Sequence, residues 1–118
     1  MRKTLFIALC AFAARVSLAA PAPATVTIKD YRFAPAIVKI ATGSTVTWTN
    51  KDADVHTVIS ATGLFVSGAL DTDDKFSYTF TKPGTYVIAC SLHPQMSETI
   101  VVEGGGLVPA AGIEPATP

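Results

Sequence analysis

The sequence is poor in the side chains that bind soft metals: its 118 residues include only two Cys, two Met and two His. It also has few charged residues, 15% in all, and no cluster of Lys and Arg. Because nucleic-acid binding depends on clustered basic side chains, this composition excludes a nucleic-acid-binding protein. No segment of any length has the apolar period of a helix, and the longest apolar run, at residues 5–14, is too short for a membrane span.

Residues 1–19 have the pattern of a secretory signal peptide. Arg2 and Lys3 precede the apolar run, and small residues lead up to Ala19, after which we expect cleavage. An uncleaved N-terminal helix is the alternative. The residue before Cys10 is a leucine and not a small residue, so we expect no lipid anchor. These features predict an exported, periplasmic protein without a membrane anchor.

Removal of the signal peptide changes the numbers of charged and metal-binding residues in the chain. Losing Arg2, Lys3 and Arg15 leaves fewer basic than acidic residues, because the chain starts with 9 of each kind. The remaining chain keeps one Cys, one Met and both His. A lone Cys in an exported protein cannot form an internal disulfide and is open to oxidation. A bound metal would protect it.

The four remaining donors have the spacing of a metal site. Cys90, His93 and Met96 lie three residues apart in one short stretch, and His56 begins an apolar run. Each alone would be a core or surface residue, but two His, one Cys and a weak axial Met form the ligand set of a blue-copper site. We therefore predict one type 1 copper ion, with His56, Cys90, His93 and Met96 as its ligands. Zinc is possible in such a site, but a Met donor favours copper.

Short alternating segments separated by Gly, Pro and Asp turns predict an all-β fold. We expect one domain, residues 20–103, built as an antiparallel Greek-key β-sandwich of seven to eight strands. The pattern does not assign a course to residues 61–70. Residues 104–118 are rich in Gly, Ala and Pro and are predicted to be a disordered tail. The expected strands are residues 25–29, 36–40, 45–49, 56–60, 75–80, 85–90 and 98–102.

The alternation of side chains between the two faces of a strand, which we call strand parity, supports the position of Cys90 in the site. Tyr86, Ile88 and Cys90 share one face of their strand, so Cys90 points inward at the strand's end if the other two face the core. His93 and Met96 then return from the following loop. Three ligands would belong to one loop, and His56 to a neighbouring strand end.

These residues resemble the cupredoxins, and among them the small amicyanin- and pseudoazurin-like electron carriers. The similarity covers residues 26–102, and the short spacing from Cys to Met looks most like amicyanin. It rests on Phe33-x-Pro35, Ile40-x-x-Gly43-x-x-Val46-x-Trp48-x-Asn50, His56, Gly84-Thr85-Tyr86 and Cys90-x-x-His93-x-x-Met96.

The resemblance implies a soluble, monomeric electron carrier that is not an enzyme. Asn50 would tie the His56 loop to the Cys90 loop. The edge of the His93 ring would reach the surface within an apolar patch of Leu92 and Pro94, where electrons leave. The implied partners are transient redox proteins of the dehydrogenase or cytochrome type.

One position departs from the family pattern. Amicyanin-like loops usually have Pro two residues after the Cys, but here Leu92 keeps a backbone N–H. We expect this group to donate a hydrogen bond to the Cys90 sulfur and to favour Cu(I). Gln95 also makes the surface patch more polar.

Two other classes of function compete with an electron carrier. A copper chaperone or storage protein could use the same ligands, with metal that exchanges readily. A copper oxidase or reductase would need an open coordination position or a second centre, and no further His remains to build one. A cysteine hydrolase is not supported, because Cys90 and His93 share one short loop and no orienting residue is apparent.

Overall fold

Eight short strands account for the regular structure of the protein, and the computed structural model describes residues 21–104. The strands are β1 (Ala24–Lys29), β2 (Arg32–Ala34), β3 (Ile37–Ala41), β4 (Thr45–Asn50), β5 (Ile59–Ser60), β6 (Lys75–Thr79), β7 (Gly84–Ala89) and β8 (Ser97–Glu103). Alternating apolar residues and turn residues divide the sequence into most of these strands as expected, but β2 was not predicted, and the strand expected at residues 56–60 is reduced to β5.

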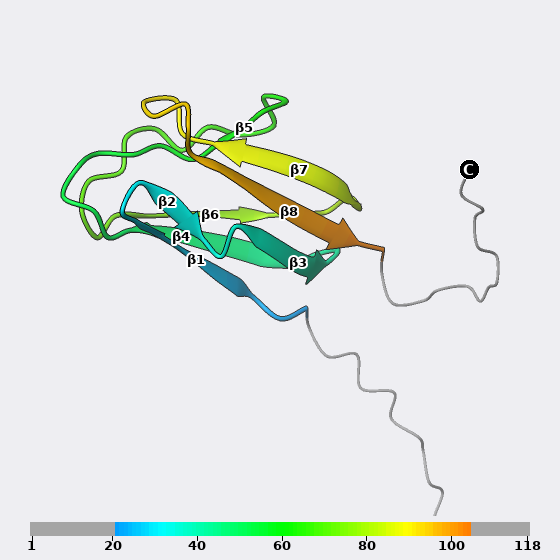
Figure 1. Ribbon diagram of the computed structural model, residues 1–118. Helices are drawn as coiled ribbons and strands as arrows, with labels where there is room; N and C mark the ends of the chain where they lie inside the picture. The colour runs from blue at the N-terminus through cyan, green and yellow to red at the C-terminus, as the bar shows by residue number, and fades with distance from the viewer. Residues whose placement is uncertain (1–20, 105–118) are drawn as a thin grey trace, which may run out of the picture.

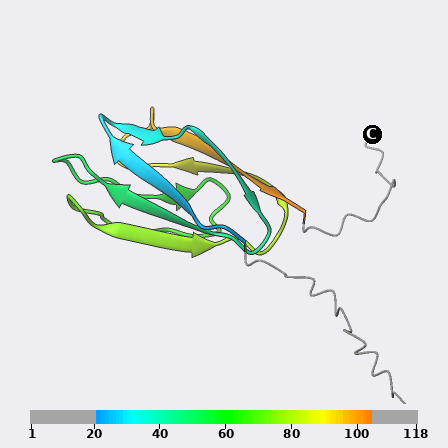
Figure 2. The same ribbon diagram turned by 90° about the horizontal axis from the view of Figure 1, so that it is seen from below.

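The strands form two four-stranded sheets that pack face to face (Figure 1). One sheet has the order β2-β1-β4-β6 and the other the order β3-β8-β7-β5. Figure 2 shows the two layers from below. The predicted all-β sandwich of seven to eight strands is confirmed, although the sheets are mixed: β1 pairs with β4, and β3 with β8, in parallel. Between β1 and β4 the chain crosses to the second sheet after β2, forms β3 there and returns to the first sheet.

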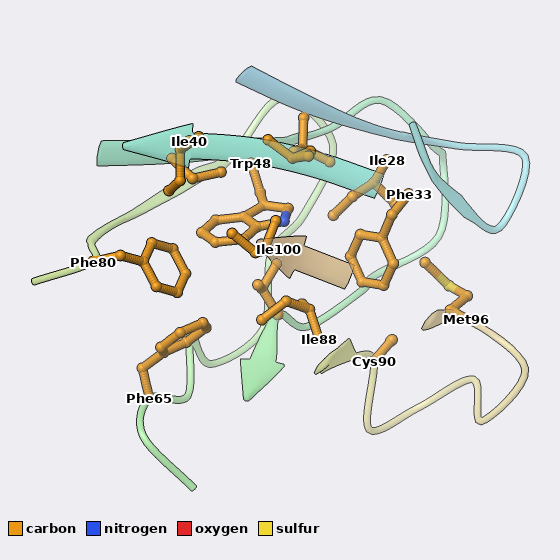
Figure 3. Close-up of a cluster of buried hydrophobic side chains, with 14 of the residues drawn as sticks. Ile28, Phe33, Ile40, Trp48, Phe65, Phe80, Ile88, Cys90, Met96 and Ile100 are labelled. Atoms are coloured by element: carbon orange, nitrogen blue, oxygen red, sulfur yellow. The ribbon is translucent and has the colours of Figure 1, made fainter. Parts of the chain in front are cut away.

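The core lies between the sheets, where alternate residues of each strand point inward. Val46 and Trp48 of β4 are fully buried, as expected. On the outer face of the same strand, Thr47 pairs its hydroxyl with that of Ser77 at 2.7 Å. The sequence predicted no secondary structure for residues 61–70. In the structure this segment contributes Phe65 to the core, where its ring packs against that of Trp48 (Figure 3).

Three segments meet at one end of the sandwich, at the left of Figure 1: the β1–β2 turn, residues 51–58 and the loop between β7 and β8. The parallel pair β1–β4 brings the first two together, because its register places Ile28 opposite Asn50. The backbone nitrogen of Lys51 then donates to the Ile28 carbonyl at 2.8 Å. Residues far apart in the sequence can therefore build one site here.

The predicted signal peptide, residues 1–19, lies outside the described residues, and so does the predicted tail after Gly104. Within the part that the structure describes, no helix is long and apolar enough to cross a membrane.

Candidate metal centre

Strand ends bring the predicted donors to the same end of the core. Cys90 directly follows β7 and is buried, as is Ile88 two residues before it, which confirms the inward face that strand parity predicts. Tyr86, on the same face, packs against the core but is only partly buried. His56 precedes β5, is fully buried, and is held by a β-bridge to Leu70.

The ligand atoms of His56, Cys90 and His93 all lie within 4.8 Å of one another. The Cys90 sulfur is 3.8 Å from Nδ1 of His56 and 3.6 Å from Nδ1 of His93. Met96 is buried, and its backbone N–H donates to the His93 carbonyl at 2.9 Å, which closes the loop. Figure 3 shows Met96 and Cys90 at the same end of the core. The structure thus groups all four predicted residues.

The surroundings of Cys90 favour a thiolate. Burial raises the pKa of this thiol, but the Thr57 backbone N–H, the neighbouring His56 and His93 imidazoles and the Leu92 backbone N–H outweigh it and lower the pKa from 9.0 to about 6. The Thr57 nitrogen lies 3.3 Å from the sulfur. The Leu92 N–H, from which the sequence led us to expect a hydrogen bond, has the smallest of these effects on the pKa. At neutral pH the sulfur is therefore ready to bind a cation without losing a proton first.

Thr57 links the His56 segment to the Cys90 loop. Its hydroxyl accepts a hydrogen bond from the Ser91 backbone nitrogen at 2.8 Å and lies 2.9 Å from the Ser91 hydroxyl. From the family resemblance we expected Asn50 to link these two segments. In the structure, Asn50 instead donates to the carbonyls of Asp54 and Leu70 and accepts from the Asp52 backbone. Asn50 therefore shapes the segment that carries His56, and within residues 21–104 its side chain forms no hydrogen bond with the Cys90 loop.

Asp52 is a buried carboxylate that sequence reasoning missed. Its Oδ2 lies 2.8 Å from Nε2 of His56. Its two oxygens also accept the backbone N–H groups of Asp30 and Tyr31, at 2.7 Å and 2.9 Å. A carboxylate on the outer nitrogen of a histidine fixes the ring and leaves the inner nitrogen free for a metal. The four-residue spacing between Asp52 and His56 is the sequence feature that could have pointed to this pair.

The outer edge of the site is partly open. His93 is only partly buried, whereas His56 has no exposed surface. Leu92 is 53% exposed, and Pro94 is exposed beside it. Tyr31, from the β1–β2 turn, packs its ring against both imidazoles and was also missed. No local pattern marks Tyr31, because the contact depends on the register between β1 and β4.

The donor set fits copper. Cys90 and Met96 offer soft sulfur, the two imidazoles offer nitrogen, and the buried hard donor nearby, Asp52, faces away toward the far nitrogen of His56. Soft sulfur donors with imidazole select copper over magnesium or calcium, which prefer oxygen.

Sequence comparisons agree with this chemistry. A model of the cupredoxin-like domain matches residues 3–102. Amicyanin-alpha from Methylorubrum extorquens is 37% identical over an alignment of 119 residues, which covers 87% of this chain and 100% of that protein. Amicyanin from Paracoccus denitrificans is 38% identical over 69 residues, which cover 54% of this chain and 53% of that protein.

Solved structures share the fold. A purple cupredoxin from Nitrosopumilus maritimus has a TM-score of 0.63 and 32% identity, covering 68% of this chain and 99% of that one. A Cu(I) structure of an amicyanin variant has a TM-score of 0.65 and 29% identity, covering 69% and 82%. A Cu-containing nitrite reductase from Thermus scotoductus also has a TM-score of 0.65, with 32% identity, but the match covers 70% of this chain and only 23% of that enzyme. By its sequence and its fold, the chain belongs to the cupredoxin-like family.

Proposed function

We propose that this protein carries single electrons and holds one copper ion with His56, Cys90, His93 and Met96. The observation that carries the proposal is the convergence of three donor atoms within 4.8 Å at one end of the sandwich. Membership of the cupredoxin-like family and the Cu(I) structure of an amicyanin variant support copper as the metal.

The residues around the site have separate tasks. Copper, when bound, supplies the one-electron change between Cu(II) and Cu(I). The Thr57 and Leu92 N–H groups stabilise the Cys90 thiolate. Asp52 holds the His56 ring, and the burial of Cys90, His56 and Met96 excludes water. A frame already in place lets the metal change its charge with little movement of the protein.

We propose that electrons leave through the partly exposed His93, beside Leu92 and Pro94. Support comes from the 53% exposure of Leu92 at the rim of the site. The partner would be a redox protein of the dehydrogenase or cytochrome type, bound transiently to the monomer, because redox encounters bury little surface.

The proposed location is the periplasm. It rests on the signal-peptide pattern of residues 1–19, with residues 20–103 as the folded domain and residues 104–118 as a tail. The mass of the exported protein tests this directly, since cleavage after Ala19 predicts a chain that begins at Ala20.

The first test of the function is the visible absorption spectrum of the mature protein after addition of Cu(II). We expect an intense blue charge-transfer band that bleaches and recovers on reduction and reoxidation. Cys90→Ser is the matched control, because it removes the sulfur and should abolish the band. A pale spectrum with readily lost metal would contradict the carrier and support the alternative, a copper chaperone or storage protein.

A further inference from the structure

Tyr31 occupies a backbone position that suits other residues better. Asp30 and Tyr31 form the two-residue turn between β1 and β2, with φ angles of 53° and 58°. Hairpin turns with two positive φ angles favour Asn, Asp and Gly, and a bulky side chain there is uncommon. A tyrosine held in this conformation needs a contact that explains it.

The contact is with both histidines of the metal centre. The Tyr31 ring lies 5.3 Å from the His56 ring at 83°, and 4.9 Å from the His93 ring at 76°, centroid to centroid. Both pairs are edge-to-face, an arrangement that aromatic rings prefer. Tyr31 is 40% exposed, whereas His56 is fully buried and His93 partly buried, so the tyrosine lies on the solvent side of the two imidazoles.

Both ends of Tyr31 are anchored. Its backbone N–H donates to Oδ2 of Asp52, the same oxygen that contacts His56, and its hydroxyl pairs with the Asp54 carboxylate. The ring is therefore fixed relative to the His56 side of the site.

His93 depends on this ring more than His56 does. Asp52 already fixes the outer nitrogen of His56. Among residues 21–104, no hydrogen bond to Nε2 of His93 is found, and its side chain is otherwise held through Nδ1 facing Cys90 and through contact with the His56 ring. Tyr31 adds a second ring contact, beside that of His56, that connects His93 to the anchored part of the frame.

We propose that Tyr31 is a positioning residue, a clamp that holds the His93 imidazole in the orientation in which it receives copper. The proposal rests on the proposed copper site. It assigns Tyr31 a role in holding the metal, in addition to a place on the surface near the electron exit.

The test compares Tyr31→Asn, which removes the ring but suits the turn, with Tyr31→Phe, which keeps the ring and loses the hydroxyl. Asp30→Asn is the matched control, because it changes the other turn residue without touching the histidines. Three quantities are measured: the imidazole NMR signals of the metal-free protein, the rate of Cu(II) loss to a chelator, and the EPR spectrum of the Cu(II) form.

For Tyr31→Asn we expect a metal-free fold at least as stable as the wild type, since Asn adopts a positive φ readily. The His93 signals should shift or broaden while those of His56 persist, and the EPR spectrum should change. Copper loss should be about tenfold faster, because removing a group that orients a metal ligand weakens metal binding by about this factor or more. Tyr31→Phe keeps the ring but loses the pair with Asp54, so it should change less than Tyr31→Asn. Asp30→Asn should remain close to the wild type.

Unchanged His93 signals and copper loss in Tyr31→Asn would overturn the clamp. Equal changes in Asp30→Asn would also overturn it, because the turn and not the ring would then be responsible. The proposed function fails separately, if wild-type protein with Cu(II) shows no intense blue band. The NMR comparison of metal-free proteins still decides whether Tyr31 holds His93.

Discussion

Asp52 and His56 form a buried pair in which the carboxylate Oδ2 lies 2.8 Å from the imidazole Nε2. If Nε2 carries the proton and donates it to Asp52, Nδ1 presents its lone pair toward Cys90, 3.8 Å away. Asp52 also accepts both backbone N–H groups of the β1–β2 turn. One carboxylate thus sets the His56 tautomer and the position of Tyr31.

Replacing Asp52 with alanine should weaken both the fold and the metal site. The change leaves His56 Nε2 and two backbone N–H groups without their acceptor, so we expect a loss of about 3 kcal/mol in the free energy of unfolding. Copper affinity should fall by about tenfold or more, because a group that orients a metal ligand is gone. Urea unfolding of the metal-free protein and competition with a chelator measure the two effects.

Asp73→Asn is the control for Asp52→Ala. Asp73 pairs with Lys51 on the surface, where both side chains are mostly exposed, so its loss should change neither quantity. Equal effects of the two substitutions would show that the loss of a negative charge, and not the loss of the pair with His56, lowers stability and copper affinity.

Leu92→Pro should lower the reduction potential. The substitution removes a backbone N–H that helps to lower the Cys90 pKa, so the thiolate loses stabilisation and Cu(II) becomes relatively more favourable. If the hydrogen bond contributes about 1 kcal/mol more to Cu(I) than to Cu(II), the shift is about 40 mV for a one-electron couple. Potentiometric titration measures it. Leu92→Ala keeps the N–H and should retain the wild-type potential, and an unchanged or higher potential in Leu92→Pro would contradict the argument.

The sequence was sufficient to predict most of the strands, but not β2, the short extent of β5 or all of the strand pairs. Alternation in segments such as Thr45–Asn50 identifies which residues face the core. It carries no information on which strand lies alongside, so the parallel pairs β1–β4 and β3–β8 could not be predicted. Residues 61–70 lack alternation, and Phe65 and Leu70 reach the core from irregular backbone.

The same limit applies to the site. The spacing of Cys90, His93 and Met96 and the scarcity of other donors were enough to predict residues that the structure groups at one end of the core. Asp52 lies four residues before His56, but this spacing alone does not reveal a buried pair, and Asp52 was missed. Tyr31 was missed because its contacts with Asp52 and both histidines join segments more than 20 residues apart. Those contacts exist only once β1 and β4 pair in register, a tertiary feature that no local pattern contains.

The buried carboxyl of Glu98 should make stability depend on pH. Its Oε1 accepts a hydrogen bond from the Trp48 indole at 2.7 Å, and its Oε2 is buried without a partner in the described structure. Burial raises the pKa of Glu98 from 4.5 to about 7, against the opposing effect of the Trp48 hydrogen bond. The folded protein therefore binds this proton more tightly than the unfolded chain does.

This contribution to stability is fully present below the unfolded pKa and is lost as the pH rises through about 7. The loss is about 3 kcal/mol, from 1.36 kcal/mol for each pKa unit. Urea unfolding of the metal-free protein, followed by Trp48 fluorescence between about pH 5 and about pH 8, measures it. Glu98→Gln should flatten this dependence, and an unchanged slope in that variant would assign it to other groups.

Thr57→Val should loosen the Cys90 loop while leaving its donors in place. Valine has nearly the shape of threonine but lacks the hydroxyl that accepts the Ser91 backbone N–H, so a partly buried donor loses its partner. The free energy of unfolding should fall by about 1 to 3 kcal/mol, and hydrogen exchange of the Ser91 amide should accelerate. The Thr57 backbone N–H still reaches the Cys90 sulfur at 3.3 Å, so the blue band should persist. Ser91→Ala keeps the bond from the Ser91 nitrogen to Thr57 and should exchange at the wild-type rate, whereas unchanged exchange in Thr57→Val would show that the hydroxyl does not hold the loop.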